Sequence, residues 1–562
     1  MALLAFGEYR PDVADLNKDY TSMLENVLPR SDGYGPVQAL EGYAEPLDGP
    51  CRGYFFARNA DATVTIFAGT ATKLYKLDNT TLGWTDVSVG GGSYTNVDAD
   101  RNWKFVQFNN FVFATQRNAV LQRFDLTSST AFANAPGSPP QAGNIAVVNR
   151  FLVLCDLLSF PYRIQWSGLN DTTNWTPGTN FSDFQDLPSG GIPRAIVGGE
   201  LGVILQDTEI RRMIYANGSD IVFDIDRIAE KIGVVGADAV TTASNRIFAY
   251  TTRGFVSLTI DGQITEIGEE RVSRTFVASA DLAAPQYIIA AADPQAGVVL
   301  WSYRDVAAGA AQFDQLLAYN YLLNRWSPIT IAGQFIATLS RPGLTLEALD
   351  AIAPGALAIT GAANNGSGLI RITVSDTSGL TTGDYKTISG VGGVTAANGS
   401  WTITVISSTT FDLQGSTFSG TYTSGGLVAG SLDELPFSLD AISGATLPAL
   451  SICGPTNAVG FLSGSPLEAV LETPEQEVSG ARIEINNLRP ETDAAHGFVA
   501  VSGRGRLSEI AVDGSEAEMD EDGNAFVLEN ARYARARLRI PAGTAWSFAT
   551  GVHPEFRKAG RY

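Results

Sequence analysis

At 562 residues, the chain is longer than a single hydrophobic core usually grows, so about two to four domains are expected. Hydrophobic residues make up 44% and charged residues 17%, a balance that excludes a chain disordered throughout. The 38 Lys and Arg against 59 Asp and Glu give a net charge of −21. Proteins that grip nucleic acid have the opposite balance, so stable DNA binding is disfavoured, whereas a surface past which DNA slides is compatible with this charge.

The first segment, residues 1–52, has a high density of Pro and Gly and few periodic strands, which predicts an extended docking arm laid on a partner or on the main body. It also carries side chains of the kind enriched at protein interfaces: Tyr9, Arg10, Tyr20, Tyr34 and Tyr43. Two interpretations stay open. If the arm docks, a chain without residues 1–45 folds but no longer joins its partners. If the arm closes the body within one chain, that chain unfolds.

Residues 53–355 are a series of strand–turn–strand units in a chain with 58 Gly and 25 Pro, which predicts an all-β fold. Trp84, Phe132 and Trp175 lie 48 and 43 residues apart, close to the ~40–50 residues of one four-stranded propeller blade. About six such units fit the segment, so we expect a β-propeller-like body. A pair of β-sandwiches gives a similar alternation and is the alternative. The recurrence of an aromatic residue before Ser or Thr, as in Trp326-Ser327, favours the propeller.

Residues 356–430 are rich in Gly, Ser and Thr, with the alternating apolar residues of exposed strands. The sequence TLEALDAI before this segment (345–352) is similar to SLDELPFSLDAI after it (431–442), which indicates an inserted small β domain on a loop of the body. We expect that deleting the insert leaves the rest folded.

Residues 431–562 are expected to close the propeller and to form a C-terminal β platform. One strand there alternates small or apolar side chains with Arg535, Arg537 and Arg539. These arginines are solvated, pair with the acidic stretch 516–524, or form an anion-binding strip.

Catalytic and metal-binding patterns are missing from the sequence. Its two histidines, His496 and His553, lie near no nucleophile motif, and HExxH, GxSxG and phosphate-binding glycine loops do not occur. The stretch 519–524 only weakly resembles a calcium loop, since it lacks the spacing and the terminal Glu of an EF-hand. We therefore expect that the protein is not an enzyme and binds no cofactor. We also expect that it has no catalytic, cofactor-binding or metal-ligating residues.

Two further groups of residues are candidates for chemical sites. A pair of carboxylates for glycoside cleavage cannot be assigned, because candidates such as Asp98, Asp100, Glu269 and Glu270 do not differ from ordinary loop acids. The cysteines are Cys51, Cys155 and Cys453. They are odd in number and far apart, which predicts unreactive free thiols rather than disulfides or a zinc site.

The apolar start of the chain, Ala2 to Phe6, follows no basic region and no run is long enough to span a membrane. We therefore expect synthesis in the cytoplasm without a membrane anchor.

The order of short motifs near the N-terminus, Pro11-Asp12, then NVLPR (26–30) and DGYGP (32–36), resembles tail proteins of short-tailed bacteriophages, the podoviruses. The later stretches 432–440, 460–473 and 536–552 are similar to later parts of the same group. The insert resembles a small β domain found in phage tail proteins and named by likeness to part of a ubiquitin-activating enzyme. The similar motifs there are DTSGLTTGDY, NGSWTITV and TTFDLQGSTFSGTYTSGG.

This resemblance implies a tail nozzle or tail tubular protein, related to packaged-DNA stabilisation hub proteins, with a β-propeller and a β platform. Such a protein forms a homohexameric ring in the virion tail, below the portal and its adaptor ring, and contacts tail fibres or a needle. It continues the channel through which double-stranded DNA is retained and ejected. An acidic lumen would repel phosphate and keep DNA from sticking.

The alternative function is a tail-associated protein that binds or depolymerises host glycans. That function requires an aromatic groove and is more often trimeric. A bacterial extracellular propeller is a third reading, against which the missing signal sequence counts.

Overall fold

The computed structural model describes residues 3–14, 19–61, 63–218, 221–341, 357–378, 380–429, 447–477 and 482–559. Within these ranges the chain is nearly all β, which confirms the predicted fold class. The helical elements are α1 (Ser273–Ser279) and the 3-10 turns η1 (Val89–Gly91), η2 (Pro285–Tyr287) and η3 (Thr395–Ala397). None of these described helices is long enough to cross a lipid bilayer.

The chain divides into two compact units. The larger unit comprises Met1–Leu77, Trp84–Arg341 and Thr446–Tyr562, and the smaller comprises Asp78–Gly83 and Pro342–Ala445.

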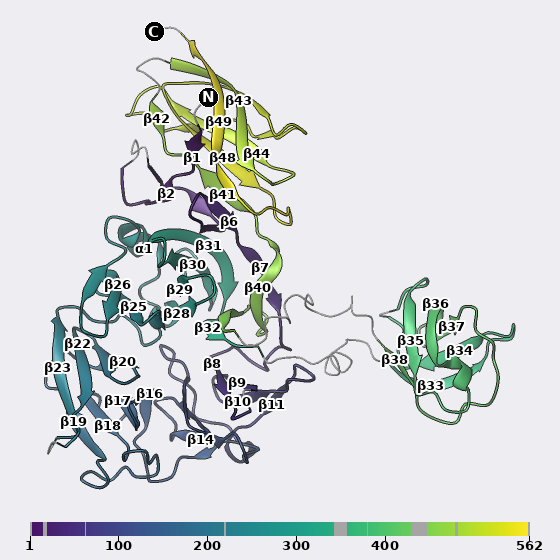
Figure 1. Ribbon diagram of the computed structural model, residues 1–562, viewed down its shortest axis with the longest axis horizontal. Helices are drawn as coiled ribbons and strands as arrows, with labels where there is room; N and C mark the ends of the chain where they lie inside the picture. The colour runs from purple at the N-terminus through teal and green to yellow at the C-terminus, as the bar shows by residue number, and fades with distance from the viewer. Residues whose placement is uncertain are drawn as a thin grey trace. The chain divides into compact units, whose positions relative to one another are not determined.

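The body of the larger unit is a β-propeller with seven four-stranded sheets as blades (Figure 1). Each of the first six blades is continuous in sequence. The first strand of each is innermost, because it packs against the first strand of a neighbouring blade. Blade 1 contains β8 (Tyr54–Arg58), β9 (Val64–Gly69), β10 (Leu74–Leu77) and β11 (Trp84–Asp86). Blade 2 contains β12 (Lys104–Phe108), β13 (Phe111–Thr115), β14 (Gln122–Asp125) and β15 (Ala133–Asn134).

Blades 3 to 6 follow the same plan. Blade 3 contains β16 (Ala142–Val148), β17 (Phe151–Leu157), β18 (Arg163–Trp166) and β19 (Asp183–Asp186). Blade 4 contains β20 (Pro193–Val197), β21 (Gly202–Gln206), β22 (Glu209–Tyr215) and β23 (Phe223–Glu230). Blade 5 contains β24 (Val240–Ala243), β25 (Arg246–Thr251), β26 (Gly254–Thr259) and β27 (Ile264–Glu266). Blade 6 contains β28 (Ala290–Asp293), β29 (Val298–Tyr303), β30 (Phe313–Asn320) and β31 (Arg325–Gly333).

Blade 7 is built from three separate parts of the chain. Its strands, from the inside outward, are β32 (Phe335–Leu339), β39 (Ala449–Cys453), β40 (Val459–Pro466) and β7 (Gln38–Gly42). The ring closes where this blade meets blade 1, and the buried Tyr54 hydroxyl donates a hydrogen bond to the Ser451 carbonyl at 2.7 Å across that junction. An N-terminal strand thus completes the last blade and fastens the ring.

Aromatic side chains fill the layers between blades, since one blade cannot cover its own two faces. Phe67, Phe124 and Phe132 pack with ring centroids 5.0–5.4 Å apart between blades 1 and 2. Trp326 on β31 is fully buried, and its ring lies 5.8 Å from that of Trp301. The aromatic residues that marked the repeat in the sequence thus lie in the layers or beside the outermost strands.

The platform of the larger unit is a sandwich of two sheets. One has six strands: β1 (Leu4–Ala5), β5 (Val27–Pro29), β6 (Tyr34–Pro36), β43 (Arg482–Thr492), β47 (Ala525–Ala531) and β49 (Ala549–Ala559). The other has seven: β4 (Leu24–Glu25), β41 (Ala469–Glu472), β42 (Gln476–Glu477), β44 (Phe498–Arg504), β45 (Val512–Asp513), β46 (Ala517–Glu518) and β48 (Tyr533–Ile540). Their shared core is continuous with that of blades 5 and 6.

Residues 1–52 are largely built into this unit rather than extended over it. They supply strands to both platform sheets, the outer strand of blade 7, and the small parallel pair β2 (Glu8–Tyr9) and β3 (Tyr20–Thr21). Leu24, Val27 and Tyr34 are each at most 2% exposed. The strands are two to five residues long, too short to produce a clear period in the sequence. The described part of the arm therefore closes the fold within one chain.

The smaller unit contains the predicted insert, which leaves the body between β32 and β39 of blade 7. It is a closed barrel of β33 (Leu357–Asn364), β34 (Ile370–Val374), β35 (Tyr385–Ser389), β36 (Gly399–Ser407), β37 (Thr410–Leu413) and β38 (Leu427–Ala429). Ile370, Ile403, Phe411 and Leu413 form part of its own core and are fully buried. The flanks 345–352 and 431–442, from which the insertion was inferred, lie outside the described residues.

Candidate functional sites

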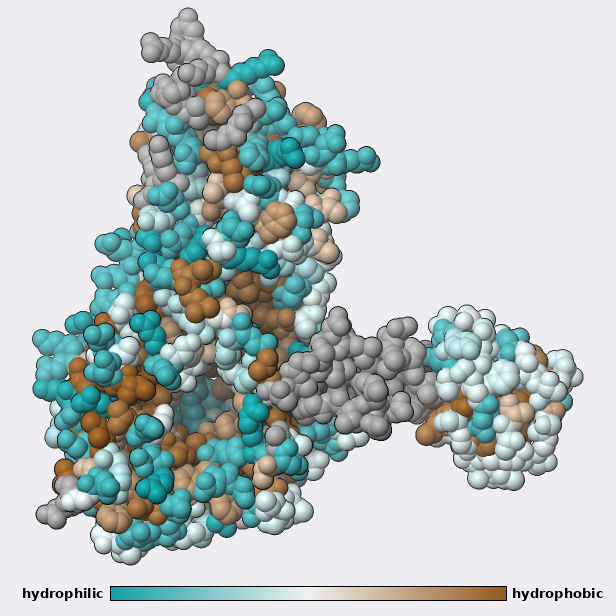
Figure 2. Space-filling view, viewed as in Figure 1, coloured by the Kyte–Doolittle hydropathy of each residue, from teal (hydrophilic) through white to brown (hydrophobic). Residues whose placement is uncertain are grey.

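The centre of the propeller contains a cavity of about 420 Å³ lined by the inner strands of six blades. Figure 2 shows the surface hollowed at the middle of the propeller. Its wall combines aromatic and aliphatic residues, such as Phe105 and Phe335, with polar and charged ones, such as Lys104, Asp238 and Thr241. A cavity of this volume is too small for a DNA duplex, and its wall carries one lysine and one aspartate rather than the row of cations found at nucleic-acid sites.

Charged groups at the cavity are paired with one another. The Lys104 ammonium forms an ion pair with Asp238, and the Asn102 amide donates to the same carboxylate at 2.9 Å. Arg52 donates to the Asn102 amide oxygen at 2.9 Å and to the Asp98 carbonyl at 2.8 Å. Both Asp238 oxygens are thus engaged, one by Lys104 and the other by Asn102.

A second ionic group surrounds Asp156, which is 1% exposed at the end of β17. Burial raises the pKa of this carboxyl, while Arg101, 3.0 Å away, and Arg117, 3.9 Å away, act in the opposite direction. The two arginines compensate for taking the charge out of water. The group fastens the blade 1–2 connection to blade 3, a structural role.

The loop acids considered in the sequence do not form one site. The Asp98 carboxylate accepts a hydrogen bond from Asn118 at 2.7 Å, and Asp100 is exposed beside it. Glu269 and Glu270 are exposed on a loop of blade 5. The pKa of Glu269 is raised by its hydrogen bond to Glu266. The structure thus places these four acids on loops of two different blades.

The cysteines, the histidines and the acidic loop do not come together in one site. All three cysteines are buried and free. His496 and His553 lie 3.8 and 3.9 Å from the carboxylates of Glu518 and Glu491. In the stretch 519–524, Asp520 accepts the backbone N–H groups of Asp522 and Asn524 at 3.0 and 2.8 Å, so it stabilises its own turn. The described residues include no cluster of His, Cys, Asp and Glu suited to a metal ion.

The arginine row on β48 pairs with acids. Arg539 contacts Glu516 at 2.6 Å and Glu468 at 3.2 Å, and Arg537 lies 3.3 Å from Asp513. Hydrogen bonds from Arg539 lower the pKa of Glu516. Of the three interpretations left open by the sequence, pairing with nearby acids describes these two arginines.

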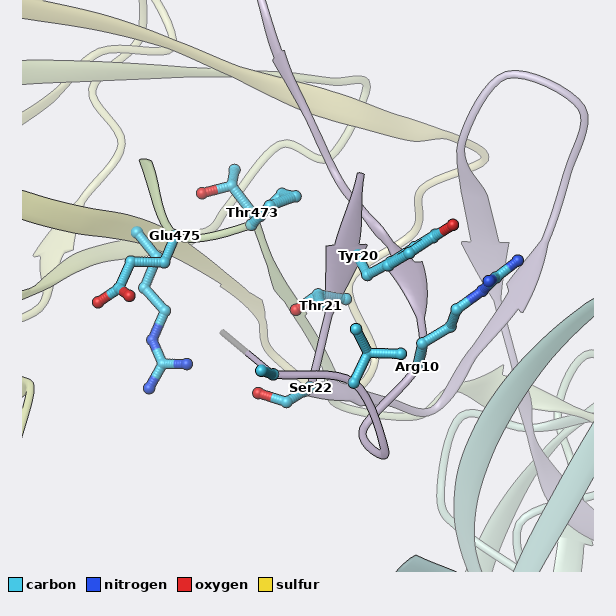
Figure 3. Close-up of a pocket in the computed structure, with 10 residues that line it drawn as sticks. Arg10, Tyr20, Thr21, Ser22, Thr473 and Glu475 are labelled. Atoms are coloured by element: carbon cyan, nitrogen blue, oxygen red, sulfur yellow. The ribbon is translucent and has the colours of Figure 1, made fainter. Parts of the chain in front are cut away.

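A small pocket lies where the N-terminal segment meets the platform (Figure 3). Its lining includes Arg10, Tyr20, Thr21, Thr473 and Glu475. The guanidinium of Arg10 lies 4.1 Å from the centre of the Tyr20 ring. The pocket measures only about 10 Å³, which is room for about one water molecule and no larger ligand.

Blade 3 carries an aromatic groove that sequence reasoning missed. A cavity of about 440 Å³ is lined by the loop before β18 and by the residues after β19. Arg163 is held in a bidentate pair with Asp186, at 2.7 and 3.0 Å, and its guanidinium lies 4.2 Å from the ring of Phe160 and 3.6 Å from that of Phe184. Phe160 and Tyr162 are more than half exposed. The run FPYR was visible in the sequence, but its partners on β19 become neighbours only through strand register.

A larger groove of about 730 Å³ lies between blades 4 and 5. The turn Gly198-Gly199 forms one side, and Ser244, Asn245 and Tyr321 contribute to the other. It shares Val197 and Thr242 with the central cavity. The two hollows therefore adjoin, where the inner strands β20 and β24 pack less closely than the other neighbouring pairs.

The insert matches a known family. Residues 365–430 match the family model of the ubiquitin-activating enzyme E1 FCCH domain. None of the three cysteines lies in that range, so the match brings no thiol for ubiquitin transfer. No curated protein matches the chain.

Solved structures similar to the chain share little sequence with it. Hsv2p of Kluyveromyces lactis is 11% identical over 48% of this chain and 74% of its own, with a TM-score of 0.29. The computationally designed protein Ika8 is 10% identical over 54% and 95%, with a TM-score of 0.31. The dihydro-heme d1 dehydrogenase NirN, in complex with DHE, is 12% identical over 70% and 79%, with a TM-score of 0.27. Similarities this weak carry no argument about function.

Proposed function

We propose that this protein is a structural, non-enzymatic subunit of a bacteriophage tail. Six copies form a nozzle ring below the portal and its adaptor ring, retain the packaged DNA and conduct it during ejection. The proposal begins from the resemblance of the stretches 11–36 and 536–552 to podovirus tail proteins. The observation that carries it is architectural: a propeller, an inserted β domain and a β platform occur in one chain, the combination that this resemblance implies.

The charge of the chain supports the same function. Each copy carries a formal charge of −21, so a ring of six repels DNA phosphate along its wall. The propeller's own cavity is too small for a duplex. In this proposal, the DNA channel is therefore the space enclosed by the six copies, and its wall is more acidic than the contacts between them.

The test is the mass and symmetry of the purified protein. Mass photometry should give particles of six times 59.6 kDa, and averaged electron micrographs should show sixfold rings with an open centre. Added adaptor rings should bind these particles. A protein that stays monomeric over the micromolar range, or a ring with a basic lumen, contradicts the proposal.

A second candidate, a glycan-binding tail protein, is favoured by the aromatic groove of blade 3. Exposed rings such as Phe160 and Tyr162 suit the apolar faces of sugars. The nearby Asp186 is held by Arg163, so the groove fits binding better than cleavage. This candidate would be favoured if the protein formed trimers that bind host surface polysaccharide and if the Tyr162→Ala variant no longer bound it.

A further inference from the structure

The six-stranded platform sheet ends in two different open edges. At one edge, β47 pairs with β43 on its inner side. On the opposite side of the sheet, β49 pairs with β1 through Leu4–Val552 and Ala5–Gly551 and, next to it, with β6, which pairs in turn with β5. Among the described residues, no backbone hydrogen bond reaches the outer side of β47 or of β1. Exposed sheet edges of this kind are ready to pair with another strand.

The β47 edge is apolar on both of its faces. Ala525 and Val527 are buried inside the sandwich, whereas Phe526 is 71% and Leu528 75% exposed. The strand contains neither Lys nor Pro, the residues that usually protect an edge, and its one charged residue is Glu529. Large exposed apolar side chains gathered at one place mark an interaction surface.

The β1 edge is also apolar. The sequence from Leu3 to Phe6 contains no charged or polar side chain, and Leu3 is 38% exposed. Phe6 is buried, and its N–H donates to the Thr550 carbonyl at 3.0 Å, which keeps this segment aligned along β49. A second strand could therefore be added beside β1 without moving the segment.

From these two edges, we infer that the platform sheets of successive copies join head to tail, with β47 of one copy pairing with β1 of the next. The occupant of each edge is a second copy of this chain, because each copy supplies both halves of the contact. A contact between two different surfaces repeats from copy to copy and closes into a ring when the rotation fits.

Register and charge agree with this arrangement. β47 faces residues 483–488 of β43, while β1 lies level with residues 490–491 of that strand. The two edges are therefore staggered along the strand direction, and stagger is what a closed ring of tilted strands requires. Because each copy carries −21, whole copies repel one another and the contact must come from apolar side chains and backbone pairing. Assembly should then strengthen as salt is added.

This inference rests on the proposed ring and assigns its contact. The test uses the full chain with three matched variants: Phe526→Asp/Leu528→Asp at one edge, Leu3→Asp/Ala5→Asp at the other, and Ile510→Asp as a platform control outside the six-stranded sheet. Mass photometry at one protein concentration should give six-copy particles for the wild type and for Ile510→Asp, and monomers for both edge variants. Mixing the two edge variants should give two-copy particles only, since one intact edge pair remains.

Each outcome bears on a different statement. A wild-type chain that stays monomeric contradicts the ring itself. A wild-type ring whose edge variants still assemble contradicts only the edge contact. Two-copy particles that persist with Leu3→Asp/Ala5→Asp indicate β47 pairing with itself and overturn the head-to-tail contact. Melting curves identify a variant that fails to fold, and the milder Leu528→Ser and Ala5→Ser then replace it.

Discussion

Removing residues 1–45 should unfold the platform and open the propeller, because the segment supplies strands to both. β1, β4, β5 and β6 disappear from the platform, and β7 from the outside of blade 7. The platform sandwich then exposes its core. In blade 7, β40 becomes an open edge. We therefore expect the truncated chain to be insoluble or partly unfolded.

The size of the effect follows from the side chains removed. Leu24, Val27, Tyr34 and Val37 are each at most 2% exposed. At about 1.5–3 kcal/mol for each fully buried side chain, their loss removes about 6–12 kcal/mol. Residual structure in the unfolded chain lowers that figure by roughly 10–40%. What remains is comparable with the whole stability of a domain, about 5–15 kcal/mol.

The assay is circular dichroism with thermal melting, supported by limited proteolysis. The matched control is a chain that lacks residues 356–430, a longer deletion that should leave the melting of the body unchanged. A truncated chain that keeps the β spectrum and melts cooperatively at the wild-type temperature would refute this reasoning. In that case residues 1–45 would serve as a docking arm after all.

Three other predictions concern single contacts or the insert. Deleting residues 356–430 with a short linker should remove the barrel's own transition and leave assembly intact, as judged by calorimetry and mass photometry; aggregation would show that the insert is integral. Tyr34→Phe should lower the stability of the body by about 1–3 kcal/mol in urea titrations, since the buried hydroxyl donates to Gly7 at 2.7 Å and accepts from Arg325 at 3.0 Å. Hydrogen bonds from Arg371 lower the pKa of Asp412 in the folded barrel. The pair therefore stabilises the barrel above the unfolded pKa of the carboxyl, and this stability is lost as pH falls through the folded pKa. In Asp412→Asn, the melting temperature of the barrel should accordingly change less between about pH 5 and pH 2 than it does in the wild type.

Features that depend on residues close together in the sequence could be predicted from it. The aromatic spacing from Trp84 to Trp175 indicated blades, because blades 1 to 3 each place one of these side chains on their outermost strand or in the segment before it. The turn between β12 and β13 has a similarly local cause, because Asn109 has a φ of 52°, a conformation that Asn tolerates better than most residues. Both features depend on residues that are neighbours in sequence.

Long-range pairing could not be predicted in the same way. Two-residue strands such as β1 and β4 have no period, and they become strands only because β49 and β41 offer them an edge. The stack of Arg163 between Phe160 and Phe184 likewise depends on the register of β18 with β19. The same limit applied to the arm, whose Pro and Gly content suggested an extended segment although its apolar residues are buried in two sheets.

The three-part blade 7 has a consequence for how the chain folds. β7 is among the first strands synthesised, but its partner β40 ends at Pro466, and the insert lies between β32 and β39. The ring can therefore close only after most of the chain has been made, and pairing of such distant strands is slow. Until then, β7 and the apolar platform strands are exposed together. The insert between β32 and β39 can fold before the ring closes. Once folded, it shortens the flexible connection between these two strands, which lowers the entropy cost of pairing them compared with an unstructured segment of the same length. On this argument, deletion of the insert with a short linker should close the ring at least as fast as the full chain does, whereas replacement by an unstructured segment of equal length should slow refolding.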